Sequence, residues 1–308
     1  MGMLRTLWLP LLLVLWLFTG CQVDPDQTFG DKIRVVTTTG MIADAVINIA
    51  GDTLEVEALM GPGVDPHLYK ATQGDLKKLT TADLILYNGL LLEGKMGEVL
   101  EKLGRIKPVI AVGSAIDTTQ LLGSPLFHNA HDPHIWFDVS LWKQVVNKIN
   151  KSLQELDPVN SEYYNRNSEN YLLRLDSLHL EVKSQIARVP PEQRVLITAH
   201  DAFEYFGRAY NIEVRGLQGL STLTEFGLKD VTDLVRFIID RQIKAVFIET
   251  SISERSIQAV VEGCRHKGHN VRIGGSLFSD AMGDKNTAEG TYIGMVNANV
   301  QIITQALK

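Results

Sequence analysis

The chain has 308 residues and a formal net charge of −6 at pH 7, and 45% of its residues are hydrophobic. A chain of this length and apolar content can stabilise itself by ordinary burial of a core. Its acidic balance argues against nucleic acid or an anionic lipid surface as a binding partner.

The first 20 residues have the features of a secretory signal peptide. Arg5 supplies a positive charge, and the apolar run Leu7–Phe18 is too short to span a membrane comfortably. Cys21 follows, and the chain then becomes polar. Residues 18–21 resemble a bacterial lipobox, which implies that Cys21 is lipidated and that residues 21–31 form a lipidated tether. An uncleaved signal anchor is the alternative, because Phe18 stands where such motifs usually have leucine.

A regular alternation of predicted strands and helices begins after the tether, which indicates βαβ units and a mainly parallel sheet. We assign residues 32–158 to an N-terminal lobe. Its expected strands cover residues 33–38, 54–60, 84–87 and 109–112. Its expected helices cover residues 41–50, 75–80, 95–103 and 139–156.

Residues 159–189 are expected to form one long connecting helix. Apolar side chains recur at helical spacing from Ser161 to Val189, and Pro190 and Pro191 end the pattern. A helix over this range would be about 43 Å long at 1.5 Å per residue, enough to join two lobes as a rigid strut. An ordinary long surface helix is the alternative.

The alternation restarts in residues 190–308, which we assign to a C-terminal lobe. Its expected strands cover residues 195–198, 212–217, 245–249 and 271–273. Its expected helices cover residues 202–210, 226–240, 254–267 and 287–307. The sequence therefore predicts an α/β protein with two (β/α)₄ lobes, each with a parallel four-stranded sheet, joined by one long helix.

The stretch His131–Asp138 places two imidazoles and two carboxylates within one short loop segment. Imidazole is the commonest metal ligand among side chains, and Pro133 stiffens the loop that presents it. A solvated turn held by hydrogen bonds is the alternative for this stretch. We expect His131 itself to hydrogen-bond the backbone.

Three further side chains follow predicted strands in the same way as His134. His67 lies past the second strand of the N-terminal lobe, and His134 past its fourth. His200 comes immediately after the first strand of the C-terminal lobe, and Asp280 follows its fourth. Open α/β sheets place their ligand crevice beyond the carboxyl ends of the strands. If the two crevices face each other, three imidazoles and one carboxylate suit Zn²⁺, or Mn²⁺ if the carboxylate binds through both oxygens.

Two more residues are expected to support this site without binding the metal. Glu249, at the end of a predicted strand, could hold a ligand in place or simply pair with a lysine. Trp136 is expected to pack behind His134.

Four motifs in order resemble the ligand motifs of the zinc and manganese solute-binding lipoproteins of bacterial ABC importers, sometimes grouped as cluster A-I. These motifs are Asp65–His67, Asp132–Trp136, Thr198–Phe203 and Phe278–Asp280. The resemblance covers essentially the whole mature chain. It implies two (β/α)₄ lobes on a long helix, one bound Zn²⁺ or Mn²⁺ ion and delivery of that ion to a membrane permease. It also implies a lipid-anchored position on the periplasmic or outer side of the cell membrane, and we expect a monomer.

The resemblance does not decide whether the bound metal is zinc or manganese. Manganese-preferring members often carry glutamate at the third ligand, where this chain has His200. Many zinc-specific members insert a histidine-rich loop before the second ligand, whereas residues 114–130 contain a single histidine, His128.

We expect a binding protein and not an enzyme. A catalytic zinc site keeps one position open for water and needs a general base within reach, whereas four protein ligands would fill the shell. A surface-tethered metallohydrolase or an adhesin that uses the same residues is the alternative. We also expect the metal to join two lobes that are otherwise only apposed.

Overall fold

The computed structural model describes residues 32–124 and 130–308, so the predicted signal peptide, the tether and Cys21 lie outside the described residues. Residues 32–308 form one compact unit. In the described part of this unit, no helix is both long enough and apolar enough to cross a membrane. We call residues 32–158 the first half and residues 190–308 the second half.

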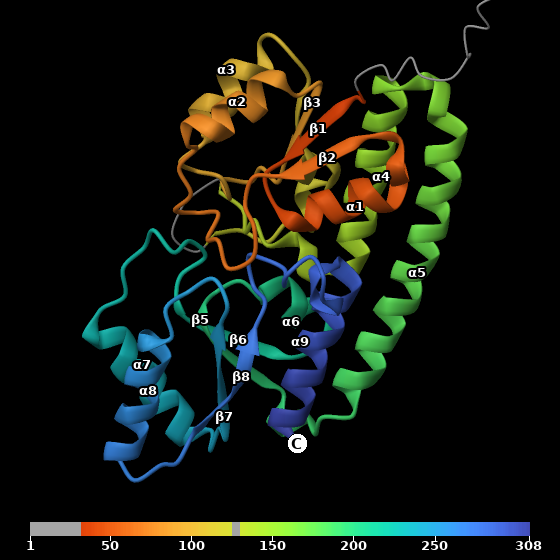
Figure 1. The fold of residues 1–308 in the computed structure, drawn as a ribbon. Helices are drawn as coiled ribbons and strands as arrows, with labels where there is room; N and C mark the ends of the chain where they lie inside the picture. Colours follow the sequence, from red (N-terminus) through yellow and green to blue (C-terminus); the bar gives the residue numbers. More distant parts are fainter. Residues whose placement is uncertain (1–31, 125–129) are drawn as a thin grey trace, which may run out of the picture. The chain divides into compact units, whose positions relative to one another are not determined.

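The first half contains the four-stranded parallel sheet that the sequence predicts (Figure 1). The strand order is β2-β1-β3-β4, and every pair is parallel. The strands are β1 (Arg34–Thr37), β2 (Glu55–Ala58), β3 (Leu84–Tyr87) and β4 (Val109–Ala111). The helices are α1 (Gly40–Ala50), α2 (Gln73–Thr81), α3 (Gly97–Gly104) and α4 (Val139–Leu156).

Both faces of this sheet are covered by helices. Alternate strand residues point to opposite faces, so Val35 and Leu86 pack in one apolar cluster with α1 and α4. Val36 and Ile85 pack in another cluster with α2 and α3. Burial on both faces explains why these strands read as continuous apolar runs in the sequence.

The long helix predicted between the halves is α5 (Ser161–Ala187), which runs beside both of them in Figure 1. It packs against α1 and α4 of the first half and against α6 and α9 of the second. It ends two residues before the predicted Val189, because the residue before a proline disfavours helical geometry and Pro190 follows. Its buried stripe is Tyr164, Tyr171, Leu175, Leu178, Val182 and Ile186.

The second half repeats the succession of strands and helices. Its strands are β5 (Val195–His200), β6 (Glu213–Gln218), β7 (Ala245–Glu249) and β8 (Arg272–Leu277). Its helices are α6 (Glu204–Tyr210), α7 (Leu228–Asp240), α8 (Arg255–His266) and α9 (Tyr292–Leu307).

Parallel strands are confirmed in this half, but the predicted single four-stranded sheet is instead two two-stranded sheets, β5-β6 and β7-β8. β5 and β7 lie next to each other without a shared ladder. At the carboxyl end of β5, the backbone N–H of His200 donates to the carboxylate of Glu249 at 2.8 Å. The backbone N–H of His200 thus bonds a side-chain carboxylate where a ladder to β7 would use a backbone carbonyl.

The two halves share one apolar core and are not merely apposed, so that expectation is wrong. Phe137 of the first half stacks on Phe203 of the second at 4.3 Å between ring centroids, and Trp142 stacks on Tyr292 at 5.2 Å. The same buried cluster runs through both halves and α5. Because core packing resists deformation, we expect the halves to move little relative to each other.

Candidate metal centre

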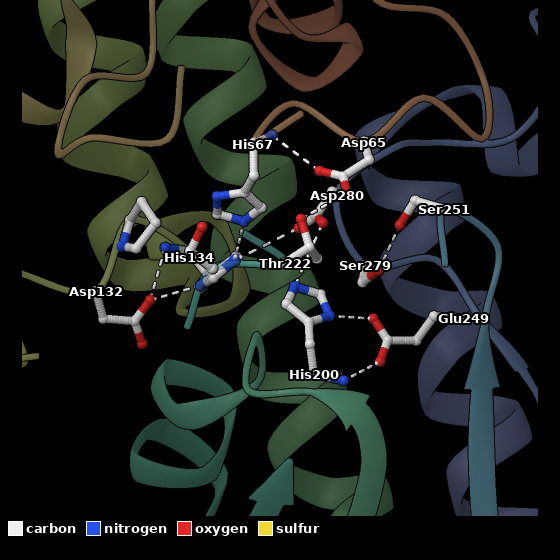
Figure 2. Close-up of polar contacts among 12 residues, drawn as sticks. Asp65, His67, Asp132, His134, His200, Thr222, Glu249, Ser251, Ser279 and Asp280 are labelled. Carbon is white, nitrogen blue, oxygen red and sulfur yellow. Dashed lines mark hydrogen bonds and ion pairs between the residues drawn. The ribbon is translucent and has the colours of Figure 1, made fainter. Parts of the chain in front are cut away.

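His67, His134, His200 and Asp280 come together in the structure (Figure 2). One ligand atom from each lies within 4.8 Å of the others, and all four residues are buried. Asp280 follows β8, and His67 and His134 lie in loops of the first half. His200 is the last residue of β5 and not the residue after a strand, because its backbone still pairs with Gln218 of β6.

The distances between these atoms fit a four-coordinate ion. His67 Nε2 lies 3.4 Å from His134 Nε2. Asp280 Oδ1 lies 3.5 Å from His134 Nε2, and Asp280 Oδ2 lies 3.3 Å from His200 Nε2. Two ligand atoms at about 2.1 Å from a tetrahedral zinc ion are themselves about 3.4 Å apart.

Three atoms of this group are buried without a hydrogen-bond partner: His200 Nε2 and both carboxylate oxygens of Asp280. A buried polar atom without a partner is costly, so natural proteins rarely keep one without a reason. A cation between the four side chains would satisfy all three atoms at once.

The His134 ring is held by a carboxylate on the side away from the centre. Asp132 Oδ1 accepts hydrogen bonds from His134 Nδ1 at 2.7 Å and from the His134 backbone N–H at 2.9 Å. This places the proton on Nδ1 and directs Nε2 to the centre. Burial lowers the pKa of His134, but Asp132 and Asp280 outweigh it and raise that pKa to about 9.

His200 is held in the same way by Glu249. Oε2 of Glu249 accepts from His200 Nδ1 at 2.6 Å, while Oε1 accepts from the His200 backbone N–H. Burial lowers the pKa of His200, but Glu249 and Asp280 together raise it well above its usual value. Of the two sequence-based readings of Glu249, this geometry favours support of a ligand over pairing with a lysine.

His67 lacks such a carboxylate among the described residues. Asp65 Oδ1 accepts only its backbone N–H, at 2.8 Å, and Asp65 Oδ2 accepts the hydroxyl of Thr222 at 2.6 Å. Burial lowers the pKa of His67 to about 3, although Asp280 partly offsets this. His67 is therefore neutral at any ordinary pH, the form that binds a metal.

Trp136 lies beside His134, with the two rings edge to face and their centroids 5.2 Å apart. Its indole N–H donates to the backbone carbonyl of Ser279 at 3.0 Å, next to Asp280. Burial raises the pKa of Asp280, but His200 and His134 outweigh it and hold that pKa well below its usual value. Trp136 thus contacts ligand-bearing segments of both halves.

Sequence reasoning assigned no role to Asp65, Asp132 or Thr222. The repeated Asp-Pro-His could have revealed the two aspartates, because each caps the backbone of the histidine two residues on. Nothing local marks Thr222, which is 157 residues from its partner. The expected backbone hydrogen bond of His131 is not formed by its Nδ1, which is buried without a partner among the described residues.

Comparisons with known proteins agree with this geometry. The family model described as "Zinc-uptake complex component A periplasmic" matches residues 35–306. The manganese-binding lipoprotein MntA of Bacillus subtilis is 50% identical over 291 residues, covering 94% of this chain and 95% of that protein. The zinc-binding protein TroA of Treponema pallidum is 49% identical over 290 residues, 94% of each chain.

Solved structures show the same fold. The periplasmic zinc-binding protein TroA from Treponema pallidum superimposes with a TM-score of 0.88 at 50% identity, covering 90% of this chain and 99% of that one. Fe(III)-bound YtgA from Chlamydia trachomatis gives a TM-score of 0.80 at 26% identity, with 89% and 98% covered. The chain therefore belongs to the family of periplasmic zinc-uptake complex component A proteins, the metal-binding components of ABC transporters.

Proposed function

We propose that this chain captures one Zn²⁺ or Mn²⁺ ion through His67, His134, His200 and Asp280 and delivers it to an ABC-type permease. The convergence of four buried side chains from four separate segments carries the proposal, because three of their atoms have no hydrogen-bond partner. The metal stays open between the two ions, since relatives of 50% and 49% identity are named for manganese and for zinc.

We further propose that the protein is not an enzyme. The four candidate ligands would fill a tetrahedral shell and leave no position for a reacting water. No geometric feature of the described residues favours the hydrolase or adhesin alternatives over metal capture.

The proposed location follows from the relatives. Several are named manganese ABC transporter substrate-binding lipoproteins. By analogy, we propose that residues 1–20 are a signal peptide, that Cys21 carries lipid, and that residues 21–31 tether a monomer to the outer side of the cell membrane. The folded part would then comprise lobes 32–158 and 190–308, joined by residues 159–189.

Titration calorimetry of metal-free protein starting after Cys21 tests metal binding. We expect one tight site per chain, and loss of that site in Asp280→Ala. His266→Ala is the matched control, because His266 is an exposed imidazole on α8. Absence of binding in the wild type, or two equal sites, would contradict the proposal. Turnover of ester, phosphate or peptide substrates by the zinc-loaded protein would favour the hydrolase.

Metal uptake by the host tests delivery. Cells in which the chromosomal copy carries Asp280→Ala should take up less of the cognate metal than cells with His266→Ala. Elemental analysis of protein purified from its own host, without added metal, identifies that metal.

A further inference from the structure

A cavity of about 270 Å³ lies beside the candidate metal centre. Of the four candidate ligands, only His67 is among the described residues that line it. Its walls come from both halves of the chain: Leu90, Leu91 and Pro133 from the first, and Leu220, Leu223 and Thr224 from the second. An ion that moved between solvent and the other three ligands through this cavity would therefore pass His67.

The wall from the second half is a short loop between β6 and α7, residues 219–227. Gln218, at the end of β6, holds this loop by donating from Nε2 to the carbonyl oxygens of Thr222, at 2.8 Å, and Thr224. Gln218 also pairs with His200 in the β5-β6 ladder. The loop is thus anchored directly beside one candidate ligand.

The hydroxyl of Thr222 joins this loop to the segment that carries His67. It donates to Asp65 Oδ2 at 2.6 Å, and the other oxygen of the same carboxylate accepts the His67 backbone N–H. Across the described ranges 32–124 and 130–308, this is the only hydrogen bond between residues 61–69 and the second half. Figure 2 shows Asp65 reaching both partners.

The segment around His134 is tied to the second half far more firmly. Tyr205 on α6 donates its hydroxyl to the Asp132 carbonyl at 3.0 Å and accepts the N–H of Leu122 at 3.1 Å. Trp136 donates to Ser279, as described above. The His67 side of the centre is consequently the side that can open with the fewest broken hydrogen bonds between the halves.

We propose that the Asp65–Thr222 hydrogen bond is a latch that limits how fast metal enters and leaves past His67. When it breaks, the His67 segment and the loop of residues 219–227 can separate, and His67 is the first ligand to leave the ion. His134 and His200 stay in place because each is gripped by a carboxylate. The latch rests on the proposed metal-binding function and adds a kinetic role for two residues that do not touch the ion.

Stopped-flow release of Zn²⁺ into excess chromogenic chelator tests the latch, at two chelator concentrations to separate spontaneous from assisted release. Thr222→Val keeps the shape of the side chain and removes its donor. We expect the release rate to rise about five- to tenfold, and a tenfold change corresponds to about 1.4 kcal/mol, near the upper range for one hydrogen bond. The association rate should rise too, so the dissociation constant should change less than the release rate.

Two variants separate a latch from a general structural role. Thr222→Ser restores the hydroxyl and should restore the wild-type release rate. Thr232→Val removes a hydroxyl that bonds only the Leu228 carbonyl within α7, and it should release Zn²⁺ like the wild type. In the metal-free protein, Thr222→Val should lower the melting temperature by no more than a few degrees, and Thr222→Ser and Thr232→Val should melt like the wild type.

Three results would overturn the latch: Thr222→Val releasing Zn²⁺ within twofold of the wild-type rate, Thr222→Ser failing to restore that rate, or Thr232→Val releasing as fast as Thr222→Val. Each leaves the proposed function standing if the wild type still binds one ion tightly. A wild type that binds no Zn²⁺ would instead overturn the proposed function itself.

Discussion

The two Asp-Pro-His motifs have the same sequence and different surroundings. In each, the aspartate accepts the backbone N–H of the histidine two residues on, at 2.8 Å for His67 and 2.9 Å for His134. Asp132 also accepts from the ring of its own histidine, whereas Asp65 turns its second oxygen to Thr222 of the other half. The motif thus produces the same local turn twice, and distant partners decide what the carboxylate does.

This difference sets the charge of the two imidazoles. Burial, aided by the charges of His134 and His200, lowers the pKa of His67 to about 3 against the opposing effect of Asp280, while Asp132 and Asp280 overcome burial and raise the pKa of His134 to about 9. The pKa of His200 is raised as well, because Glu249 accepts a hydrogen bond from its ring as Asp132 does from the ring of His134. One candidate ligand is therefore neutral and lightly held, and two are gripped by carboxylates that favour their protonated form.

The largest expected effect is a loss of metal affinity with falling pH. His134 and His200 must each lose a proton to bind an ion, whereas His67 is already neutral. Two competing protons lower the affinity about 100-fold per pH unit, or about 10⁴-fold between pH 8 and pH 6. Titration calorimetry in buffers of different protonation enthalpy should show about two protons released per ion at pH 7. Release of fewer than one would mean that His134 and His200 are neutral in the free protein.

The combined contribution of His134 and His67 to the stability of the metal-free protein should be greatest near pH 6.5. The pKa of His134 is raised on folding, so its contribution to the free energy of unfolding is complete below about pH 6.5 and disappears as the pH rises through about 9. The pKa of His67 is lowered on folding, so its contribution is lost as the pH falls from about 6.5 toward 3. Calorimetric melting from pH 4 to 9 checks this; a melting temperature that rose steadily to pH 9 would contradict it.

The next largest effects are expected when one of two candidate ligands is removed, in His134→Ala and in His67→Ala. Loss of a residue that only orients a ligand costs about 10- to 100-fold in affinity, so loss of a ligand should cost more than about 100-fold in both variants. Their metal-free forms should differ. His134→Ala leaves Asp132 buried without its imidazole partner, and breaking such a pair costs about 3–5 kcal/mol. His67→Ala keeps the backbone N–H that Asp65 accepts and deprives no carboxylate of a ring partner.

Scanning calorimetry of the two metal-free variants measures this difference. His134→Ala should melt at least about 5 °C below the wild type, given roughly 2–4 °C per kcal/mol for a chain of this size. His67→Ala should melt within about 2 °C of it. An equal decrease in melting temperature in the two variants would mean that the two motifs contribute equally to the stability of the fold.

The elements of the fold were largely predictable because their signals are local. β3, α4 and β7 have the predicted ends, since each is a continuous apolar or amphipathic run with clear boundaries. β5 was predicted too short because a polar histidine does not read as part of a buried strand. That histidine, His200, pairs in the structure with Gln218 and Glu249, which lie far from it in the sequence.

The convergence of the candidate ligands could also be predicted, because carboxyl ends of parallel strands share one edge. The hydrogen bonds that hold these ligands in place could not be predicted. The Asp65–Thr222 bond and the Tyr205–Asp132 bond join residues 157 and 73 positions apart, and no periodicity marks either pair. The shared core between the halves was missed for the same reason.

A smaller effect should follow from changing the two aspartates of the motifs. Asp132→Asn removes the charge that favours proton placement on His134 Nδ1, so zinc affinity should fall about 10- to 100-fold. Asp65→Asn touches no ring, so zinc affinity should change less than about tenfold. Glu249→Gln is the matched comparison for Asp132→Asn, because Glu249 accepts hydrogen bonds from the ring and the backbone of His200 as Asp132 does from those of His134. Competition with a chelator of known affinity measures all three, and an equal loss in Asp65→Asn and Asp132→Asn would remove the distinction between the motifs.

The smallest effect is expected for Trp136→Phe. This change keeps an aromatic ring beside His134 and removes the indole N–H that donates to the Ser279 carbonyl, next to Asp280. That carbonyl would then lose a buried donor, at a cost of about 1–3 kcal/mol, and the melting temperature should fall by a few degrees. Because Asp280 is still drawn inward by His134 and His200, zinc affinity should fall less than about tenfold. Calorimetric melting and chelator competition check both numbers. A loss of affinity as large as that of Asp132→Asn would show that the Trp136–Ser279 bond positions Asp280 as firmly as Asp132 positions His134.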